Sequence, residues 1–144
     1  MGRHPFSALA TLLGPVLGIL SLFWSGPAAA DWAWLTANDT MTAYFDMGNI
    51  RRYEGGFVRM WALSDLAQPQ LSDPNNKYFR SAASQSEFDC VKRQSRLLSY
   101  RWYAGGMGRG ELVYSDYDPS GWTPVAPNTL AAALMRAACG TAID

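Results

Sequence analysis

The two cysteines of this 144-residue chain, Cys90 and Cys139, constrain its fold more than any other feature. They lack the C-x-x-C spacing of a redox pair, and the only histidine that could generate a reactive thiolate is His4, in the first few residues. In an oxidising compartment such a pair most simply forms a disulfide. The bond would close a loop of about 50 residues, which the chain-entropy model values at about 4 kcal/mol of folding free energy. We therefore expect one domain that a covalent bond closes near its C-terminus.

The first thirty residues have the layout of a signal peptide. A basic start is followed by a long uncharged stretch, and Ala28 and Ala30 put small residues at positions −3 and −1 of a cleavage site. We predict cleavage after Ala30, which separates a signal peptide (1–30) from an exported domain (31–144) without a membrane span. The alternative is a retained anchor, because the apolar stretch is close to the length of a bilayer span. The small residues at the end of the stretch favour cleavage, since a membrane anchor does not need them.

The charge balance excludes a dedicated nucleic-acid-binding protein. Twelve basic residues face twelve acidic ones, and removal of the signal peptide takes away Arg3, leaving 11 basic residues against 12 acidic. A net charge near −1 does not draw a protein onto nucleic acid or an anionic membrane. The same cleavage removes His4, so the exported domain can contain no histidine-based triad, general base or metal site. We expect no cofactor and no bound metal.

Alternating apolar and polar residues predict that most of the domain is an antiparallel sheet. The stretch 57–65 is apolar on both faces, which indicates a central strand. Pro69 and Pro74 cannot donate ladder hydrogen bonds, so Gln68 to Asn76 is predicted to be a loop. The predicted strands are Trp32–Thr36, Met41–Asp46, Ile50–Tyr53, Phe57–Asp65, Arg80–Cys90, Arg93–Tyr103 and Glu111–Asp116.

The hydrophobic period changes at the C-terminal end, where it predicts a helix. Asn128 is the predicted N-cap and Gly140 the C-cap of a helix over residues 129–139. Its apolar residues fall on one half of the helix, with Cys139 at the edge of that face. Cys90 follows an alternating stretch and is predicted to point inward. The helix can therefore lie on the sheet with the two cysteines in reach of each other.

Three motifs that can carry chemistry have a structural explanation that fits better. Residues 105–110 lack the Gly-Lys-Ser/Thr ending of a phosphate loop and are predicted to be a flexible strand connection. Residues 116–121 match the first half of a calcium loop, but Pro127 stands where the bidentate glutamate belongs. Glu87 and Asp89 could be the paired carboxylates of a hydrolase. Without a histidine or a recognisable nucleophile, a solvated strand face is the better prediction, and we expect no catalytic residue.

A basic stretch that contains aromatic residues is the strongest candidate for a binding surface. Six basic residues lie within 25 residues of an otherwise acidic chain, interleaved with Tyr78, Phe79 and Tyr100. Arginine and aromatic side chains are enriched where proteins recognise other proteins. The alternative is that these charges protect the sheet edges from aggregation. The candidate partner-binding residues are Lys77, Tyr78, Arg80, Lys92, Arg93, Arg96 and Arg101.

Several short segments, taken in their order and spacing, point to a family. The core consists of Lys-Tyr-Phe-Arg-Ser at residues 77–81, Cys90 nine residues later, and Arg-Leu-Leu-Ser-Tyr at 96–100. Tyr-Phe-Asp at 44–46 and the terminal segment 130–140 flank this core. Together they resemble the surface-adhesin protein E family of Gram-negative bacteria, over nearly all of the exported domain.

The resemblance implies both a fold and a function. The implied fold is an α+β domain, an antiparallel sheet of about six strands with a C-terminal helix packed on its concave face and tethered by the disulfide between Cys90 and Cys139. The implied function is that of an adhesin, a non-enzymatic protein that binds host extracellular-matrix and serum proteins, often as a homodimer. The adhesive surface is expected within residues 77–101.

The resemblance leaves two locations open. Adhesive members of the family are lipoproteins displayed on the outer membrane, whereas neither cysteine of this chain stands at the predicted cleavage point. An adhesin would be exported to the cell surface of a Gram-negative bacterium. The alternative is a soluble periplasmic envelope factor or inhibitor that binds another protein.

Overall fold

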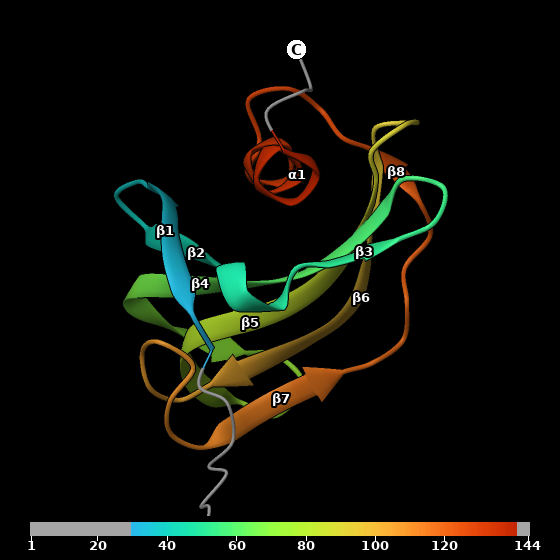
Figure 1. Cartoon of the computed structure of the whole chain (residues 1–144). Helices are drawn as coiled ribbons and strands as arrows, with labels where there is room; N and C mark the ends of the chain where they lie inside the picture. The colour runs from blue at the N-terminus through green and yellow to red at the C-terminus, as the bar shows by residue number, and fades with distance from the viewer. Residues whose placement is uncertain (1–29, 141–144) are drawn as a thin grey trace, which may run out of the picture.

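The computed structural model describes residues 30–140, so residues 1–29 of the predicted signal peptide lie outside them. A strongly curved antiparallel sheet wraps around a single C-terminal helix (Figure 1). Six strands follow one another in the order β1-β2-β4-β5-β6-β7, while β3 pairs with β4 and β8 with β6. The predicted α+β fold is confirmed: seven strands correspond to those predicted along the sequence, and β8 is a further short one. The elements are β1 (Trp32–Ala37), β2 (Met41–Asp46), η1 (Met47–Asn49), β3 (Arg51–Tyr53), β4 (Phe57–Ser72), β5 (Lys77–Asp89), β6 (Gln94–Tyr103), β7 (Leu112–Asp116), β8 (Thr123–Pro124) and α1 (Leu130–Cys139).

Strand β4 is the central strand that its two-sided apolar pattern predicts. It pairs with β2 and β3 along one edge and with β5 along the other. Met60 is buried toward the helix, and Leu63, on the opposite face, is also fully buried. The turn before β4 uses Gly55 and Gly56, both at positive φ, which other residues rarely adopt.

The loop predicted for Gln68–Asn76 is wrong over its first half. Strand β4 continues to Ser72, and the turn is confined to residues 73–76. The ladder with β5 shifts register between Asp65 and Gln70, and Pro69 lies within this irregular stretch. A bulge leaves residues outside the ladder, so the missing N–H of Pro69 removes no regular hydrogen bond.

Helix α1 packs its apolar face on the concave side of the sheet and is covalently fixed there. Leu134, Met135 and Ala138 form one buried cluster with side chains of β4 and β5. Cys90 and Cys139 form the predicted disulfide, with their Cα atoms 5.8 Å apart. No helix among residues 30–140 has the length and apolar character needed to cross a membrane.

The caps of α1 lie at, or one residue from, the positions predicted from the sequence. Thr129, not the predicted Asn128, is the N-cap, since its hydroxyl accepts a hydrogen bond from Ala132 N at 3.1 Å. Asn128 instead takes a positive φ just before the helix. Gly140 is the predicted C-cap, and its N–H donates to Arg136 O.

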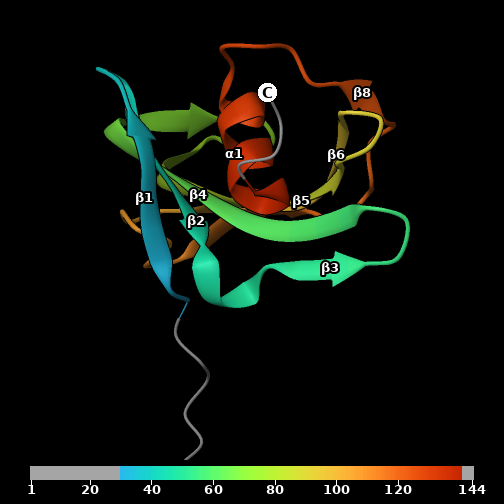
Figure 2. The same cartoon turned by 45° about the horizontal axis from the view of Figure 1, so that its top comes forward.

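Strand alternation separates two faces of the sheet. Met60 and Ala62 pack in the helix cluster, so Trp61 between them points to the other side. Figure 2 shows α1 lying across β4 and β5 on one side of the sheet. We call the side opposite α1 the open face. The register places Arg59, Trp61, Glu87, Arg96 and Arg101 on it.

Candidate binding surface

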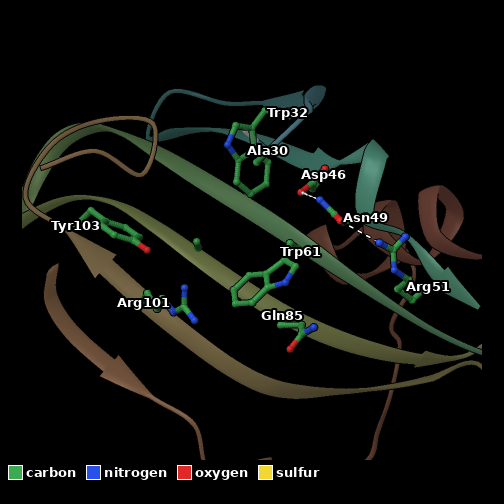
Figure 3. Close-up of a pocket in the computed structure, with 10 residues that line it drawn as sticks. Ala30, Trp32, Asp46, Asn49, Arg51, Trp61, Gln85, Arg101 and Tyr103 are labelled. Atoms are coloured by element: carbon green, nitrogen blue, oxygen red, sulfur yellow. Dashed lines mark hydrogen bonds between the residues drawn. The ribbon is translucent and has the colours of Figure 1, made fainter. Parts of the chain in front are cut away.

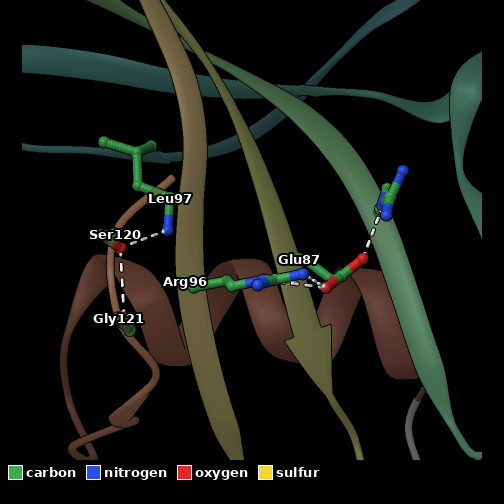
Figure 4. Close-up of polar contacts among 6 residues, drawn as sticks. Glu87, Arg96, Leu97, Ser120 and Gly121 are labelled. Carbon is green, nitrogen blue, oxygen red and sulfur yellow. Dashed lines mark hydrogen bonds and ion pairs between the residues drawn. The ribbon is translucent and has the colours of Figure 1, made fainter. Parts of the chain in front are cut away.

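Three charged side chains cross the open face in a row. Arg59 on β4, Glu87 on β5 and Arg96 on β6 stand directly opposite one another in the register. Arg59 Nε donates to Glu87 Oε2 at 2.5 Å, and Arg96 Nε and Nη2 donate to Glu87 Oε1 at 2.9 and 2.7 Å (Figure 4). The Glu87 side chain is only 6% exposed. We call this set the paired row, because two guanidinium groups share one buried carboxylate.

Aromatic rings close both ends of the paired row. The guanidinium carbon of Arg59 lies 4.8 Å from the centre of the Tyr53 ring, and that of Arg96 lies 4.8 Å from the centre of the Trp122 ring. Ser120 holds the segment that carries Trp122 against β6, since it exchanges backbone and hydroxyl hydrogen bonds with Leu97 (Figure 4). Both arginines are thus paired on one side and stacked on the other.

The solvated strand face predicted for Glu87 and Asp89 is wrong, because each residue is 5% exposed. Burial alone raises the pKa of Glu87, but the hydrogen bonds and charges of Arg59 and Arg96 lower it by more, so its net pKa lies below the usual range. Asp89 Oδ1 accepts the backbone N–H groups of Val91 and Lys92 and so holds the turn after β5. Glu87 is therefore ionised at neutral pH, and both of its oxygens accept hydrogen bonds from arginines. A carboxylate in this state has no proton to donate, which makes it a poor general acid.

A pocket of about 410 Å³ lies on the same face, beside the paired row (Figure 3). Its walls come from β1, β4, β5 and β6 and from the segment around η1. Two indole rings, two guanidinium groups and a few neutral polar groups face the hollow. The lining residues are Ala30, Trp32, Asp46, Asn49, Arg51, Trp61, Ala83, Gln85, Arg101 and Tyr103.

Arg101 is the cation of this pocket that stacks on aromatic rings. Its guanidinium carbon lies 5.2 Å from the centre of the Trp61 ring and 5.6 Å from that of Tyr117. Among residues 30–140 it forms no ion pair, and its buried Nε has no hydrogen-bond partner. Burial alone lowers the pKa of Arg101, but the Tyr103 and Tyr117 hydroxyls raise it by more, so the group stays charged.

The one carboxylate in the pocket wall is already engaged in holding the chain. Asp46 is 3% exposed. Its Oδ1 accepts from Asp31 N at 3.2 Å and Gly48 N at 3.1 Å, and its Oδ2 accepts from Asn49 Nδ2 at 2.7 Å. Asn49 Oδ1 in turn accepts from Arg51 Nη2 at 3.2 Å. Asp46 therefore caps η1 and fixes the start of β1, and it does not pair with either arginine of the pocket.

The glycine-rich connection between β6 and β7 is anchored to the sheet instead of being the flexible link that the sequence predicts. Met107 N donates to Asp65 Oδ1 at 2.7 Å, and Gly108 N donates to Ser81 Oγ at 2.9 Å. A Cβ atom on Gly105 would lie 2.8 Å from the backbone oxygen of Arg109, so the close approach within this connection requires glycine there. The anchor lies beside Tyr103, which is opposite Ser81 in the register and lines the pocket.

Comparison with known proteins assigns the chain to a family. The family model described as surface-adhesin protein E matches residues 32–140. The chain belongs to the surface-adhesin protein E family. No curated protein matches the sequence.

Solved structures of Haemophilus influenzae protein E share the fold of this adhesin E-family chain. Crystal form II of that protein aligns with a TM-score of 0.58 and 16% identity, covering 73% of this chain and 91% of the other. A second structure of the same protein aligns with a TM-score of 0.58 and 20% identity, covering 78% of this chain and 89% of the other. At such identities the likeness concerns the fold alone.

The seven residues that the sequence predicts to bind a partner lie in three separate parts of the structure. Lys77, Tyr78 and Arg80 lie at the start of β5, whereas Lys92 and Arg93 lie in the turn after it. The nine residues 81–89 of β5 separate Arg80 from the turn by about 30 Å of strand. The other two candidates, Arg96 and Arg101, lie on the open face.

Several of these side chains already have partners. Lys77 Nζ pairs with Glu111 Oε1 at 2.8 Å, and Arg80 Nε donates to Leu66 O at 2.7 Å. Phe79, part of the aromatic signal in the sequence, is 8% exposed and stacks on Trp102 within the core. A role for these residues in binding stays a prediction.

The sequence analysis missed Arg51, Trp32 and Trp61, which line the pocket with Arg101. It also missed Arg59, which lies opposite Glu87 in the register. The available signal was the alternation of Arg59 and Trp61 along one face of a central strand. An arginine on such a strand is expected either to pair with an acidic residue or to bind a ligand, since burial of an unpaired charge is costly.

Proposed function

We propose that this surface-adhesin protein E-like chain is an exported, non-enzymatic protein that binds other proteins through its open face. The observation that carries the proposal is that Arg101 of this face is stacked on the rings of Trp61 and Tyr117 and forms no ion pair among residues 30–140. Stacking holds a guanidinium group in place before binding, which reduces the entropy lost when a partner docks. Arginine, tryptophan and tyrosine are also the residues that dominate the energy of protein interfaces.

Exposed aromatic side chains extend the same surface. Trp34, which pairs with Tyr44 in the register and so points to the open face, is 64% exposed. Tyr53 and Tyr117, which stack on Arg59 and Arg101, are 48% and 57% exposed. Large aromatic groups on a surface favour a partner that covers them.

Family membership supports host extracellular-matrix or serum proteins as the partner class. The test is surface plasmon resonance of the purified exported protein over immobilised matrix proteins. We expect saturable binding, and we expect the double variant Arg51→Glu/Arg101→Glu to lose it. The matched control is Arg52→Glu/Arg136→Glu, which makes the same change of charge away from the open face. Absence of binding by the wild type, or equal loss in both variants, would contradict the proposal.

The proposed export includes cleavage of residues 1–30. Asp31 N lies 3.2 Å from Asp46 Oδ1, so the amino group created by cleavage would keep this contact as an ion pair. Intact-mass measurement of the exported protein should give a chain that begins at Asp31. A chain that retains residues 1–30 would contradict this step.

A soluble periplasmic factor that binds another envelope protein is the second candidate. The observation that favours it is that Cys90 and Cys139 are bonded to each other, so neither can carry a lipid. Protease treatment of whole cells separates the two candidates. Digestion on intact cells supports surface display, whereas protection until the outer membrane is opened supports the periplasmic factor.

A further inference from the structure

We propose that the pocket of the open face binds the carboxylate side chain of a partner protein, with Arg101 as the principal ligand and Arg51 as the second cation. The inference deepens the proposed function and rests on it in one respect, namely that the partner is a protein. It assigns to the pocket a chemical class of ligand, an aspartate or glutamate side chain.

The charge balance of the open face carries the first step. Of its four arginines, Arg59 and Arg96 each form an ion pair with Glu87. Arg51 and Arg101 form no ion pair with any of residues 30–140. The hydrogen bonds of Asp46 go to Asp31, Gly48 and Asn49, so it does not serve as their counter-ion. The pocket wall thus holds two arginines without an ion-pair partner against the one carboxylate of Asp46, and this excess of positive charge favours an anionic ligand.

The geometry of Arg101 carries the second step. The rings of Trp61 and Tyr117 each stack on its guanidinium group and so limit the directions in which its N–H groups can point. The Nε atom is fully buried and has no acceptor among the described residues, which is rare for a charged donor. A carboxylate accepts two parallel N–H bonds from one guanidinium group, and this fork-to-fork pairing is stronger than a bond to a neutral acceptor.

The size and walls of the pocket carry the third step. Its volume of about 410 Å³ is near the small end of ligand sites, enough for a side chain and a short piece of backbone. Trp32 and Trp61 offer apolar surface for the methylene groups of such a side chain, and Gln85 offers a neutral hydrogen-bonding group. Ala30 lies in the wall, and the predicted cleavage would remove it and widen the entrance.

The test uses two blocked amino acids that differ only in charge. N-acetyl-glutamate amide and N-acetyl-glutamine amide are titrated into the exported protein, labelled with ¹⁵N. The indole N–H signal of Trp61 and the Nε–H signal of Arg101 are followed by NMR. We expect saturable shifts of both signals with the glutamate compound and at least tenfold weaker binding of the glutamine compound. Arg101→Gln should weaken glutamate binding at least tenfold, whereas Arg52→Gln, on the same strand as Arg51 but on the other face, should leave it unchanged.

Three results would overturn the inference: equal shifts from the two compounds, unchanged binding in Arg101→Gln, or tighter binding of inorganic sulfate at matched ionic strength. Sulfate preference would indicate a site for a tetrahedral anion. The titration contains no partner protein, so its outcome is separable from that of the proposed function. Matrix-protein binding without a glutamate response rejects the pocket alone, and the reverse result rejects the adhesive function alone.

Discussion

The paired row and the pocket lie side by side on the open face and use the same kinds of residue, yet their arginines are in different states. Arg59 and Arg96 share the buried carboxylate of Glu87, so each has an acidic partner inside the chain. Arg101 is stacked as they are, but it has no acid partner among residues 30–140. Under the proposed function, this difference separates scaffold from site, because an arginine that already pairs with an acidic residue is less available to a partner protein than one that does not.

The two regions should therefore respond to substitution in opposite ways. Changing the paired row should lower the stability of the fold, because it leaves buried charges without partners. Changing Arg101 should affect binding with little cost to the fold, because no interaction with an acidic residue is lost. The predictions below are ordered by the size of the expected effect.

The largest effect should come from removing the disulfide with Cys90→Ser/Cys139→Ser. The free energy of unfolding should fall by about 4 kcal/mol, as expected for a bond that closes a loop of this length. Urea unfolding at pH 7 measures the change. Cys90 follows the end of β5, near Glu87, so amide exchange should rise at the paired row more than at the pocket. An equal rise of amide exchange in the paired row and in the pocket would contradict the distinction between these two regions.

The variant Glu87→Gln should lower the free energy of unfolding by about 2 kcal/mol. The loss is smaller than for a fully buried ion pair, because the side chains of Arg59 and Arg96 are 40% and 31% exposed and can turn to water. The control is Glu111→Gln, which breaks the exposed pair with Lys77 and should leave the melting temperature unchanged. Equal melting temperatures for both variants would show that the paired row is not a scaffold.

Acid should weaken the paired row by the same mechanism. The pKa of Glu87 is lowered in the folded chain, so its contribution to stability is present above the pKa it has when unfolded. That contribution is lost as the pH falls through the folded pKa. Urea unfolding between pH 7 and pH 3 should show a decline that Glu87→Gln reduces. If the stability of Glu87→Gln falls with pH as steeply as that of the wild type, other carboxylates cause the loss of stability in acid.

The smallest effect is expected at the turn after β5. Lys92→Glu/Arg93→Glu reverses two charges that the sequence singles out, but this turn lies outside the open-face pocket. Binding to the matrix protein should change by twofold or less, as expected for charges at the rim of an interface. Surface plasmon resonance gives the comparison with Arg51→Glu/Arg101→Glu. A greater loss of affinity in the turn variant than in Arg51→Glu/Arg101→Glu would show that the binding surface lies at the turn.

Much of the fold could be predicted because it depends on local patterns. Alternation predicts most strands, the helical period predicts α1, and an exported pair of cysteines predicts the disulfide. The extension of β4 past Pro69 was missed, because a proline excludes a regular ladder but not a bulge.

The binding surface was harder to predict, because the strand register assembles it. Lys77, Arg80 and Lys92 belong to one basic stretch of the sequence, although most of β5 separates the first two from the turn that carries Lys92. Trp61 and Arg101 are 40 positions apart, yet the guanidinium group of one stacks on the ring of the other. A sequence read without its register cannot place such residues together.

A side-by-side comparison of Arg101→Gln and Glu87→Gln tests the central claim most directly. Each variant is measured for its affinity for the matrix protein and for its melting temperature. The account predicts that Arg101→Gln loses at least tenfold in affinity at an unchanged melting temperature, whereas Glu87→Gln melts lower and keeps its affinity while folded. The opposite pattern, with stability lost at Arg101 and affinity lost at Glu87, would contradict the assignment of scaffold and site.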